Sequence, residues 1–302
     1  MRILVSGASG FVGSAISREL SGEGHSVSPL LRISSEHLPS WDPARGEIAA
    51  SQLEGFDAVI HLAGASLADG RWTQRRRHIF RESRVPATGL LCETLSSLKS
   101  PPKVFIGASA VGIYGSRADE ELDENSSSGK GFLAQLGQDW EAATLPASEA
   151  GIRVAHLRMG MVLGQSGGAL PKLVPLFLVG LGGRLGNGRQ WMSWVSLDDL
   201  LAMIRFILEQ DSLSGAFNAV ADQPLRNAEF TRELARALNR PAWLPAPAFA
   251  LKLIMGKMAD EMLLSSQRVR PARLLEAGFE FEHPNLRAAL EHHLGKRKGS
   301  RA

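Results

Sequence analysis

The sequence is poor in several features, and each shortage excludes a class of protein. Its 302 residues include one cysteine, Cys92, so an intramolecular disulfide is impossible. No apolar run reaches the roughly 18–20 residues that span a bilayer. The N-terminus also lacks the longer apolar stretch and small-residue cleavage site of a signal peptide. These absences predict a cytoplasmic protein with no membrane segment.

Metal-binding patterns are also missing. No cysteine and histidine cluster has the spacing of a zinc site. His292 and His293 are adjacent in a helical stretch, and neighbouring residues of a regular helix do not face one another. The sequence therefore predicts no metal site.

The excess of positive charge is small. The formal net charge is +3, and the basic residues of the C-terminal end alone exceed it, namely Lys296, Arg297, Lys298 and Arg301. Residues 295–302 are thus predicted to form a flexible basic tail. No nucleic-acid partner is expected, although RNA binding through the basic segments is kept as a minor alternative.

Short apolar runs alternate with longer helical patterns over residues 1–160. The strand candidates are rich in Val, Ile and Leu, as strands buried on both faces are: Arg2–Ser6, Ser26–Leu31, Ala58–Leu62, Val104–Ala108, Arg153–Leu157 and a weaker one near Glu47–Ala49. Helix candidates lie between them at 11–22, 73–98 and 130–149. This alternation predicts an α/β fold with a Rossmann-type doubly wound parallel sheet.

The pattern changes after Gly160. Residues 164–190 are rich in glycine, and helices are predicted over 198–209, over 227–239 and in a last portion ending near residue 294. The predicted domains are therefore a nucleotide-binding Rossmann domain over 1–160, with a contribution from 190–225, and a smaller mixed C-terminal lobe over 161–302 for the substrate.

A glycine-rich turn joins the first strand to the first helix. Gly7 permits a tight turn, Gly10 lets a phosphate approach the backbone, and Gly13 lets the helix lie close to the sheet. The N–H groups at the start of that helix then point toward a pyrophosphate. The turn predicts a dinucleotide site formed by Gly7, Ser9, Gly10, Phe11, Val12 and Gly13.

The end of the second strand indicates which dinucleotide binds. An NAD site usually carries an acidic residue about 20 residues beyond the glycines. This chain has Leu31 and Arg32 there. A guanidinium attracts a 2′-phosphate, whereas a carboxylate repels it. We therefore expect NADP(H) to be the cofactor.

The glycine spacing, G-x-x-G-x-x-G, resembles that of the short-chain dehydrogenase/reductase superfamily and of its extended, sugar-nucleotide epimerase-like branch. Residues 60–64, 108–115 and 157–164 resemble that branch's H-x-A-G, S-S-x-A-V-Y-G and R-x-x-x-V-Y-G segments. A closer resemblance is to the "epimerase family protein" subgroup. It is carried by three segments, 70–73, 139–143 and 264–269, and the last belongs to a small C-terminal extension characteristic of that subgroup.

The resemblance implies further site residues. Leu62, Ala63 and Gly64 would pass beneath the adenosine ribose. Arg84 would lie on the nicotinamide side, where the branch commonly has asparagine, and Met161 belongs to the segment that lines the nicotinamide. Ser109 would be the catalytic serine.

The usual proton shuttle is incomplete in this chain. The superfamily pairs its serine with a Tyr-x-x-x-Lys motif, in which the lysine lowers the tyrosine pKa. Residues 128–142 contain no tyrosine, and Lys130 is misplaced. The single tyrosine, Tyr114, either supplies the acid or corresponds to the V-Y-G tyrosine that shapes the pocket.

Two functional hypotheses follow from the incomplete shuttle. The first is an NADP(H)-dependent oxidoreductase or epimerase acting on a nucleotide-sugar or another small polar substrate, with Ser109 and Tyr114 as catalytic residues. The second is a non-catalytic NADP(H)-binding protein with a regulatory or assembly role. Either protein would be a monomer or a homodimer. The homodimer is considered because relatives often dimerise through a helix pair.

Overall fold

The computed structural model describes residues 1–32, 35 and 37–295. The predicted basic tail therefore lies, from residue 296 on, outside the described residues. The chain divides into two compact units, and each is described by itself. The first comprises residues 1–110, 135–158 and 204–217, and the second comprises 111–134, 159–203 and 218–302.

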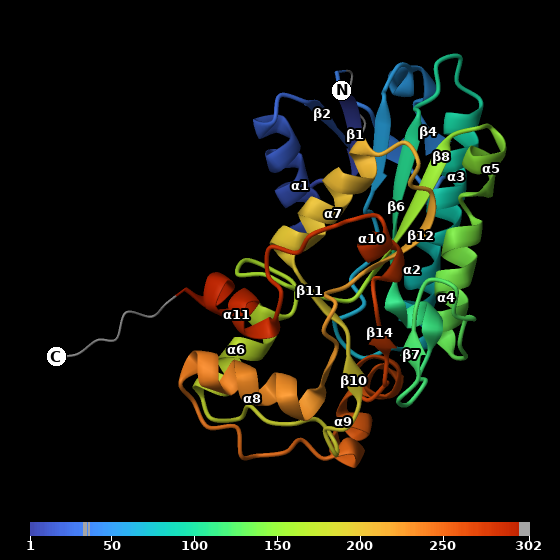
Figure 1. Ribbon diagram of the computed structural model, residues 1–302. Coiled ribbons are helices and arrows are strands. Elements are labelled where there is room, and N and C mark those ends of the chain that lie inside the picture. Colours follow the sequence, from blue (N-terminus) through green and yellow to red (C-terminus); the bar gives the residue numbers. More distant parts are fainter. Residues whose placement is uncertain (33–34, 36, 296–302) are drawn as a thin grey trace. The chain divides into compact units, whose positions relative to one another are not determined.

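A six-stranded sheet forms the centre of the first unit, in the order β12-β8-β6-β5-β1-β2 (Figure 1). Its strands are β1 (Arg2–Ser6), β2 (Ser26–Leu30), β5 (Ala58–His61), β6 (Val104–Ala110), β8 (Arg153–Met159) and β12 (Gly215–Ala219). The pairs β1–β2, β1–β5 and β5–β6 are parallel. The chain leaves β1 toward β2 and then crosses to β5 on the other side, so a topological switch point lies beside β1. The predicted fold class is confirmed.

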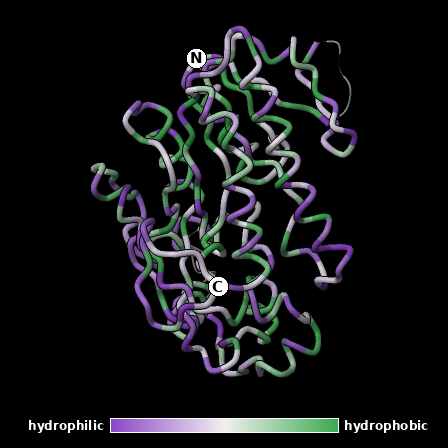
Figure 2. The backbone as a smooth tube through the Cα atoms, turned by 90° about the vertical axis from the view of Figure 1, so that its right-hand side faces the viewer, coloured by the Kyte–Doolittle hydropathy of each residue, from purple (hydrophilic) through white to green (hydrophobic). Residues whose placement is uncertain are grey.

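Helices cover the sheet. These are α1 (Phe11–Gly22), α2 (Gln74–Glu82), α3 (Val85–Ser96), α4 (Phe132–Ala142), α5 (Leu145–Glu149) and α7 (Leu197–Glu209). The starts of α4 and α7, up to residues 134 and 203, belong to the second unit. Figure 1 shows α1 and α7 on one side and α3, α4 and α5 on the other. Leu91 and Leu95 of α3 pack with Leu4, Val59 and Phe105 of the strands in one apolar core. Figure 2 shows hydrophilic and hydrophobic colours alternating along the helices, as helices with one face on a core require.

Three predicted elements differ from the structure. The weak strand candidate near 47–49 is β4 (Glu47–Ile48), which pairs antiparallel with β3 (Trp41–Asp42) outside the central sheet. The predicted helix 73–98 is two helices, broken at Ser83 and Arg84. The predicted helix 130–149 is also two, α4 and α5. Pro86 and Pro146 lie in the first turns of α3 and α5, and a proline has no N–H to donate to the carbonyl four residues earlier. Those carbonyls belong to Glu82 and Ala142, where α2 and α4 end.

The second unit is a mixed assembly of short elements. Its strands are β7 (Glu121–Leu122), β9 (Met161–Leu163), β10 (Trp191–Met192), β11 (Trp194–Ser196), β13 (Leu225–Arg226) and β14 (Arg268–Val269), which form two-stranded sheets. Its helices are α6 (Leu170–Leu178), α8 (Asn227–Leu238), α9 (Ala248–Met255), α10 (Ala272–Glu276) and α11 (Leu286–Leu294). Single turns complete both units: η1 (Ala50–Leu53), η2 (Val111–Tyr114) and η3 (Ala259–Leu263). A core of Trp194, Phe230, Leu234 and Leu290 joins β11, α8 and α11.

Candidate functional site

The three glycines of the β1–α1 turn lie where larger residues would collide with backbone. Gly7 has φ +71°, and a Cβ on it would lie 2.8 Å from the carbonyl carbon of Leu62. A Cβ on Gly13 would lie 2.1 Å from the Gly7 carbonyl oxygen. That oxygen also accepts a hydrogen bond from the Gly10 N–H at 2.9 Å. The turn, the first helix and the end of β5 are therefore in direct backbone contact, as close packing through glycine requires.

The N-terminus of α1 has the properties of an anion site. Its N-cap is Gly10, and among the described residues no side chain caps the helix and no acidic residue lies in its first turn. The first N–H groups of a helix have no partner within it and carry partial positive charge. Ser9 is exposed, and Phe11 and Val12 are half-buried. A dinucleotide pyrophosphate is the kind of group that such a helix end binds.

The predicted 2′-phosphate residues lie at the end of β2. The Leu31 N–H donates to the Pro39 carbonyl at 2.8 Å, and the Leu31 carbonyl accepts from the Trp41 N–H at 2.8 Å. These bonds hold the backbone at the carboxyl end of the strand. Arg32, the next residue, is exposed. Its guanidinium is thus accessible at the edge of the sheet that also carries the glycine turn.

The end of β5 approaches the glycine turn and a buried arginine. The Leu62 N–H donates to the Ser6 carbonyl at 3.1 Å, and the Ala63 N–H donates to Ser6 Oγ at 3.4 Å. A Cβ on Gly64 would lie 3.1 Å from Cζ of Arg84. The structure therefore brings these four predicted residues together with the turn.

Arg84 is a buried cation bonded to neutral oxygens. Its guanidinium donates to the carbonyls of Ala65 (3.0 Å) and Phe80 (3.2 Å), and it lies 5.0 Å from the ring centre of Trp140. Burial lowers the pKa of Arg84 to about 10, so the side chain stays charged at neutral pH. A buried positive charge beside the glycine turn favours an anionic ligand.

A chain of polar contacts connects the strands beneath this site. Ser6 Oγ lies 2.6 Å from His61 Nδ1, and His61 Nε2 lies 2.9 Å from Oγ1 of Thr88. Trp140 Nε1 donates to the same Thr88 oxygen at 2.9 Å. Burial lowers the pKa of His61 to about 4, so the imidazole is neutral at pH 7. These contacts tie β1 and β5 to α3 and α4.

Ser109 belongs to a buried hydrogen-bond network whose other members, Glu141 and Arg158, were not predicted from the sequence motifs. Its hydroxyl donates to Glu141 Oε1 at 2.6 Å. Arg158 binds the same carboxylate through both oxygens, with Nε at 2.9 Å from Oε1 and Nη2 at 2.8 Å from Oε2. The side chains of Arg158 and Glu141 are only 12% and 13% exposed. Both residues lie in segments that carry the family resemblance, but no motif assigned them a role.

The network holds Glu141 as a carboxylate. Burial raises the pKa of Glu141, but the hydrogen bond and charge of Arg158, with smaller effects of His156 and Ser109, outweigh burial and lower it overall. Burial lowers the pKa of His156, although the charge of Glu141 opposes the shift. A serine hydroxyl bonded to an ionised carboxylate can pass a proton to it. The site therefore contains a serine, a proton acceptor and an arginine that fixes the acceptor.

The remaining predicted residues lie in the second unit. Tyr114 is fully buried, and its hydroxyl donates to Oδ1 of Asn218 at 2.7 Å. This geometry favours the pocket-shaping alternative for Tyr114 over the role of acid. Lys130 is exposed, and Met161 is half-buried in β9, which pairs with β11.

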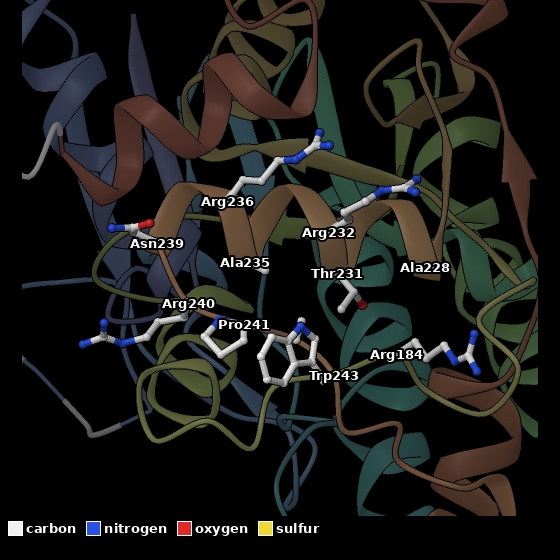
Figure 3. Close-up of a pocket in the computed structure, with 11 residues that line it drawn as sticks. Arg184, Ala228, Thr231, Arg232, Ala235, Arg236, Asn239, Arg240, Pro241 and Trp243 are labelled. Carbon is white, nitrogen blue, oxygen red and sulfur yellow. The ribbon is translucent and has the colours of Figure 1, made fainter.

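The second unit also contains an open pocket of about 690 Å³ beneath α8. Figure 3 shows Thr231 on the side of the helix that faces Trp243, whereas Arg232 and Arg236 project from the other side. Arg236 is paired with Glu233 at 2.6 Å. The arginines diverge and do not converge on a common ligand position.

One sequence-based interpretation of the histidines is wrong. His292 and His293 do approach a common point, because Nε2 of each lies 3.4 Å from Oδ2 of Asp198. Their rings are inclined by 78° with centres 5.1 Å apart. The Nε2 atoms of His292 and His293 thus lie near one position, although the two residues are neighbours that leave the helix in different directions.

Within the described residues, no helix is long and apolar enough to cross a membrane.

A family model described as the NAD dependent epimerase/dehydratase family matches residues 3–219. A second, described as a domain of unknown function (DUF1731), matches residues 246–293.

Relatives match over nearly the whole length. "Epimerase family protein ML0860" of Mycobacterium leprae is 43% identical over 293 residues, which cover 96% of this chain and 94% of that protein. The crystal structure of human epimerase family protein SDR39U1 (isoform2) with NADPH has a TM-score of 0.89 at 32% identity and covers 97% of this chain and 99% of that one. The UDP-glucose 4-epimerase of Thermus thermophilus in complex with NAD, at 19% identity and a TM-score of 0.76, covers 98% of this chain and 100% of that one, and shares the fold.

Proposed function

The chain belongs to the NAD-dependent epimerase/dehydratase family, and on that premise we propose that it is an NADP(H)-dependent oxidoreductase or epimerase. Its substrate would be a nucleotide-sugar or another small polar molecule. The observation that carries the proposal is the glycine turn, where a Cβ on Gly13 would meet the Gly7 carbonyl 2.1 Å away beneath an uncapped helix end. Such a turn leaves backbone N–H groups free for a pyrophosphate.

The residues of the first unit proposed to hold the coenzyme come from the β1–α1 turn, the start of α1, the ends of β2 and β5, and the N-cap of α3. They are Gly7, Ser9, Gly10, Phe11, Val12, Gly13, Leu31, Arg32, Leu62, Ala63, Gly64 and Arg84. The assignment of Met161, which lies in the second unit, stays a prediction from the resemblance. The exposed Arg32 supports the choice of NADP(H), because a guanidinium can bind a 2′-phosphate through two hydrogen bonds. The human relative with NADPH supports the same choice.

Ser109 and Glu141 would transfer the proton of the reaction. The nicotinamide, when bound, supplies or accepts hydride at a substrate carbon. In the oxidative direction, Ser109 Oγ would accept the proton of the substrate hydroxyl while its own proton passes to Glu141, 2.6 Å away. Arg158 would hold the carboxylate in place and keep it ionised beforehand. This relay would replace the absent Tyr-x-x-x-Lys pair.

A second candidate is a non-catalytic NADP(H)-binding protein with a regulatory or assembly role. The buried Tyr114 favours it, because the only tyrosine of the chain has its hydroxyl engaged with Asn218. This candidate predicts tight coenzyme binding without turnover.

Substitution of Ser109 by alanine tests the catalytic proposal. We expect a panel of nucleotide-sugars, small alcohols and ketones to reveal NADP(H)-dependent turnover. Removal of the hydroxyl should then lower kcat by about 10²–10⁴-fold, the usual contribution of a positioned proton-transfer group. The coenzyme Kd should stay within about twofold, because Ser109 is not among the residues proposed to bind the phosphates.

Ser14→Ala is the matched control, since Ser14 is an exposed serine of α1 whose hydroxyl donates to the Phe11 carbonyl at 3.3 Å. An unchanged kcat in Ser109→Ala would contradict the role of the serine. Tight binding with no turnover across the panel would instead support the second candidate.

A further inference from the structure

Three histidines and an aspartate of the second unit gather around one oxygen atom. Asp198 lies in the first turn of α7, His283 in the segment before α11, and His292 and His293 at the end of α11. The Nε2 atom of each histidine is 3.4 Å from Oδ2 of Asp198. These four residues are called the histidine cluster below.

The contacts within the cluster are not hydrogen bonds. Oδ2 of Asp198 and Nε2 of both His283 and His293 are buried and have no hydrogen-bond partner in the part of the chain that the structure describes. The side chains of His283 and His293 are 8% and 6% exposed. Burying such atoms without a partner is unfavourable. Their convergence on one position is therefore the feature that calls for an explanation.

The distances from Asp198 Oδ2 to the three histidine nitrogens match those between the ligands of a small metal ion. A tetrahedral zinc has Zn–N and Zn–O bonds of about 2.0–2.2 Å, which place its ligand atoms roughly 3.3–3.5 Å apart. The ligand atoms of Asp198, His292 and His293 all lie within 4.8 Å of one another. A His–Asp ion pair, by contrast, would have one aligned hydrogen bond at about 2.7–2.9 Å.

The chemistry of the donors agrees with this geometry. Imidazole nitrogen binds zinc and other first-row transition metals, and it binds them in the neutral form.

Asp199 positions one of the four residues. It is fully buried, and its Oδ1 accepts the N–H of Glu282 at 2.7 Å and that of His283 at 3.4 Å. Its Oδ2 accepts the Ser196 hydroxyl at 2.6 Å. The backbone that carries His283 is therefore fastened to the start of α7, as supporting bonds do around metal ligands.

We propose that the histidine cluster binds one divalent transition-metal ion, with zinc as the favoured metal. Asp198, His292 and His293 supply three ligand atoms close to one another, and His283, 3.4 Å from Asp198 Oδ2, would be the fourth ligand, so that the site is closed and has a structural role. The ion would fasten α11 and the segment before it to the start of α7. The site lies entirely in the second unit and is independent of the proposed coenzyme site.

Metal analysis of the full-length protein tests this directly, provided that the protein carries no histidine tag. After removal of metal with a chelator, titration with zinc alone should show one ion per chain with a Kd tighter than about 1 µM. Cobalt(II) in place of zinc should give the intense visible absorption of a tetrahedral ion. Chelation should lower the melting temperature by several degrees, because the ion binds only the folded state.

Variants assign the ligands. His293→Gln and Asp198→Asn should each weaken zinc binding by at least about 100-fold, since each removes one ligand of a closed site. His78→Gln is the control, because His78 is an exposed histidine of α2. The proposal is overturned if the wild type takes up no zinc, if cobalt gives no tetrahedral spectrum, or if binding persists unchanged in the two ligand variants.

Discussion

Substituting Gly13 by alanine should greatly weaken coenzyme binding and destabilise the first unit. The added Cβ would lie 2.1 Å from the Gly7 carbonyl oxygen and 3.0 Å from Cα of Ala8. The turn must therefore move away from α1, and forcing atoms into a packed site costs about 1–3 kcal/mol or more. Displacing the N–H groups from the pyrophosphate should raise the NADPH Kd by at least about 100-fold, or roughly 2.8 kcal/mol. Urea unfolding and NADPH titration measure the two effects.

Gly22→Ala is the matched control on the same helix. A Cβ on Gly22 meets nothing within 4 Å, and its backbone is helical. Alanine is also the better helix former by about 0.5–1 kcal/mol, so this variant should be as stable as wild type or slightly more so. Equal NADPH affinity in Gly13→Ala and Gly22→Ala would contradict the role assigned to the turn.

Replacing Glu141 by glutamine should give the second large effect. The substitution keeps the size of the side chain but removes the negative partner of Arg158. The Arg158 side chain, which is only 12% exposed, is then left without a carboxylate. Breaking a buried ion pair from one side costs about 3–5 kcal/mol. The proposed proton relay also loses its acceptor, so any turnover should fall as far as in Ser109→Ala.

The same helix offers a control for Glu141. Asp139 pairs with Arg81, but this pair is partly exposed, and such pairs contribute only about 0–1 kcal/mol. Asp139→Asn should therefore leave stability nearly unchanged. A loss in Glu141→Gln no larger than that in Asp139→Asn would show that the network does not stabilise the unit.

The pH dependence of stability gives a further check on Glu141. Because its pKa in the folded protein lies below the usual value, its stabilisation is present above the unfolded-state pKa. That contribution is lost as the pH falls through the folded-state pKa. The stability profile of Glu141→Gln should lack this acidic decline.

The β1–α1 turn could be predicted from sequence because each glycine there has a local reason. Gly7 needs its positive φ, and Gly13 needs the space that a Cβ would fill. The buried strands on both sides carry a clear apolar signal. The fold class was predicted from the alternation of strands and helices, and the family from the resemblance of several segments; both are confirmed.

Other features depend on contacts between residues that are distant in sequence, or on local sequence signals that contradict one another. Glu141 is separated from Ser109 by 32 positions, and only the fold brings them to 2.6 Å. Asp198 and His293 meet through the packing of α7 and α11, which no spacing rule describes. The break at Ser83 and Arg84 did have a signal in Pro86, but the apolar periodicity of 73–98 continues across it.

The most direct test of the account is an equilibrium titration of NADPH and NADH into wild-type protein and Arg32→Asp. We predict one coenzyme per chain and a preference of the wild type for NADPH. In the variant, NADPH binding should weaken by about 10- to 100-fold, or roughly 1.4–2.8 kcal/mol, with a much smaller change for NADH. A folded wild-type protein with no affinity for either coenzyme would contradict the account.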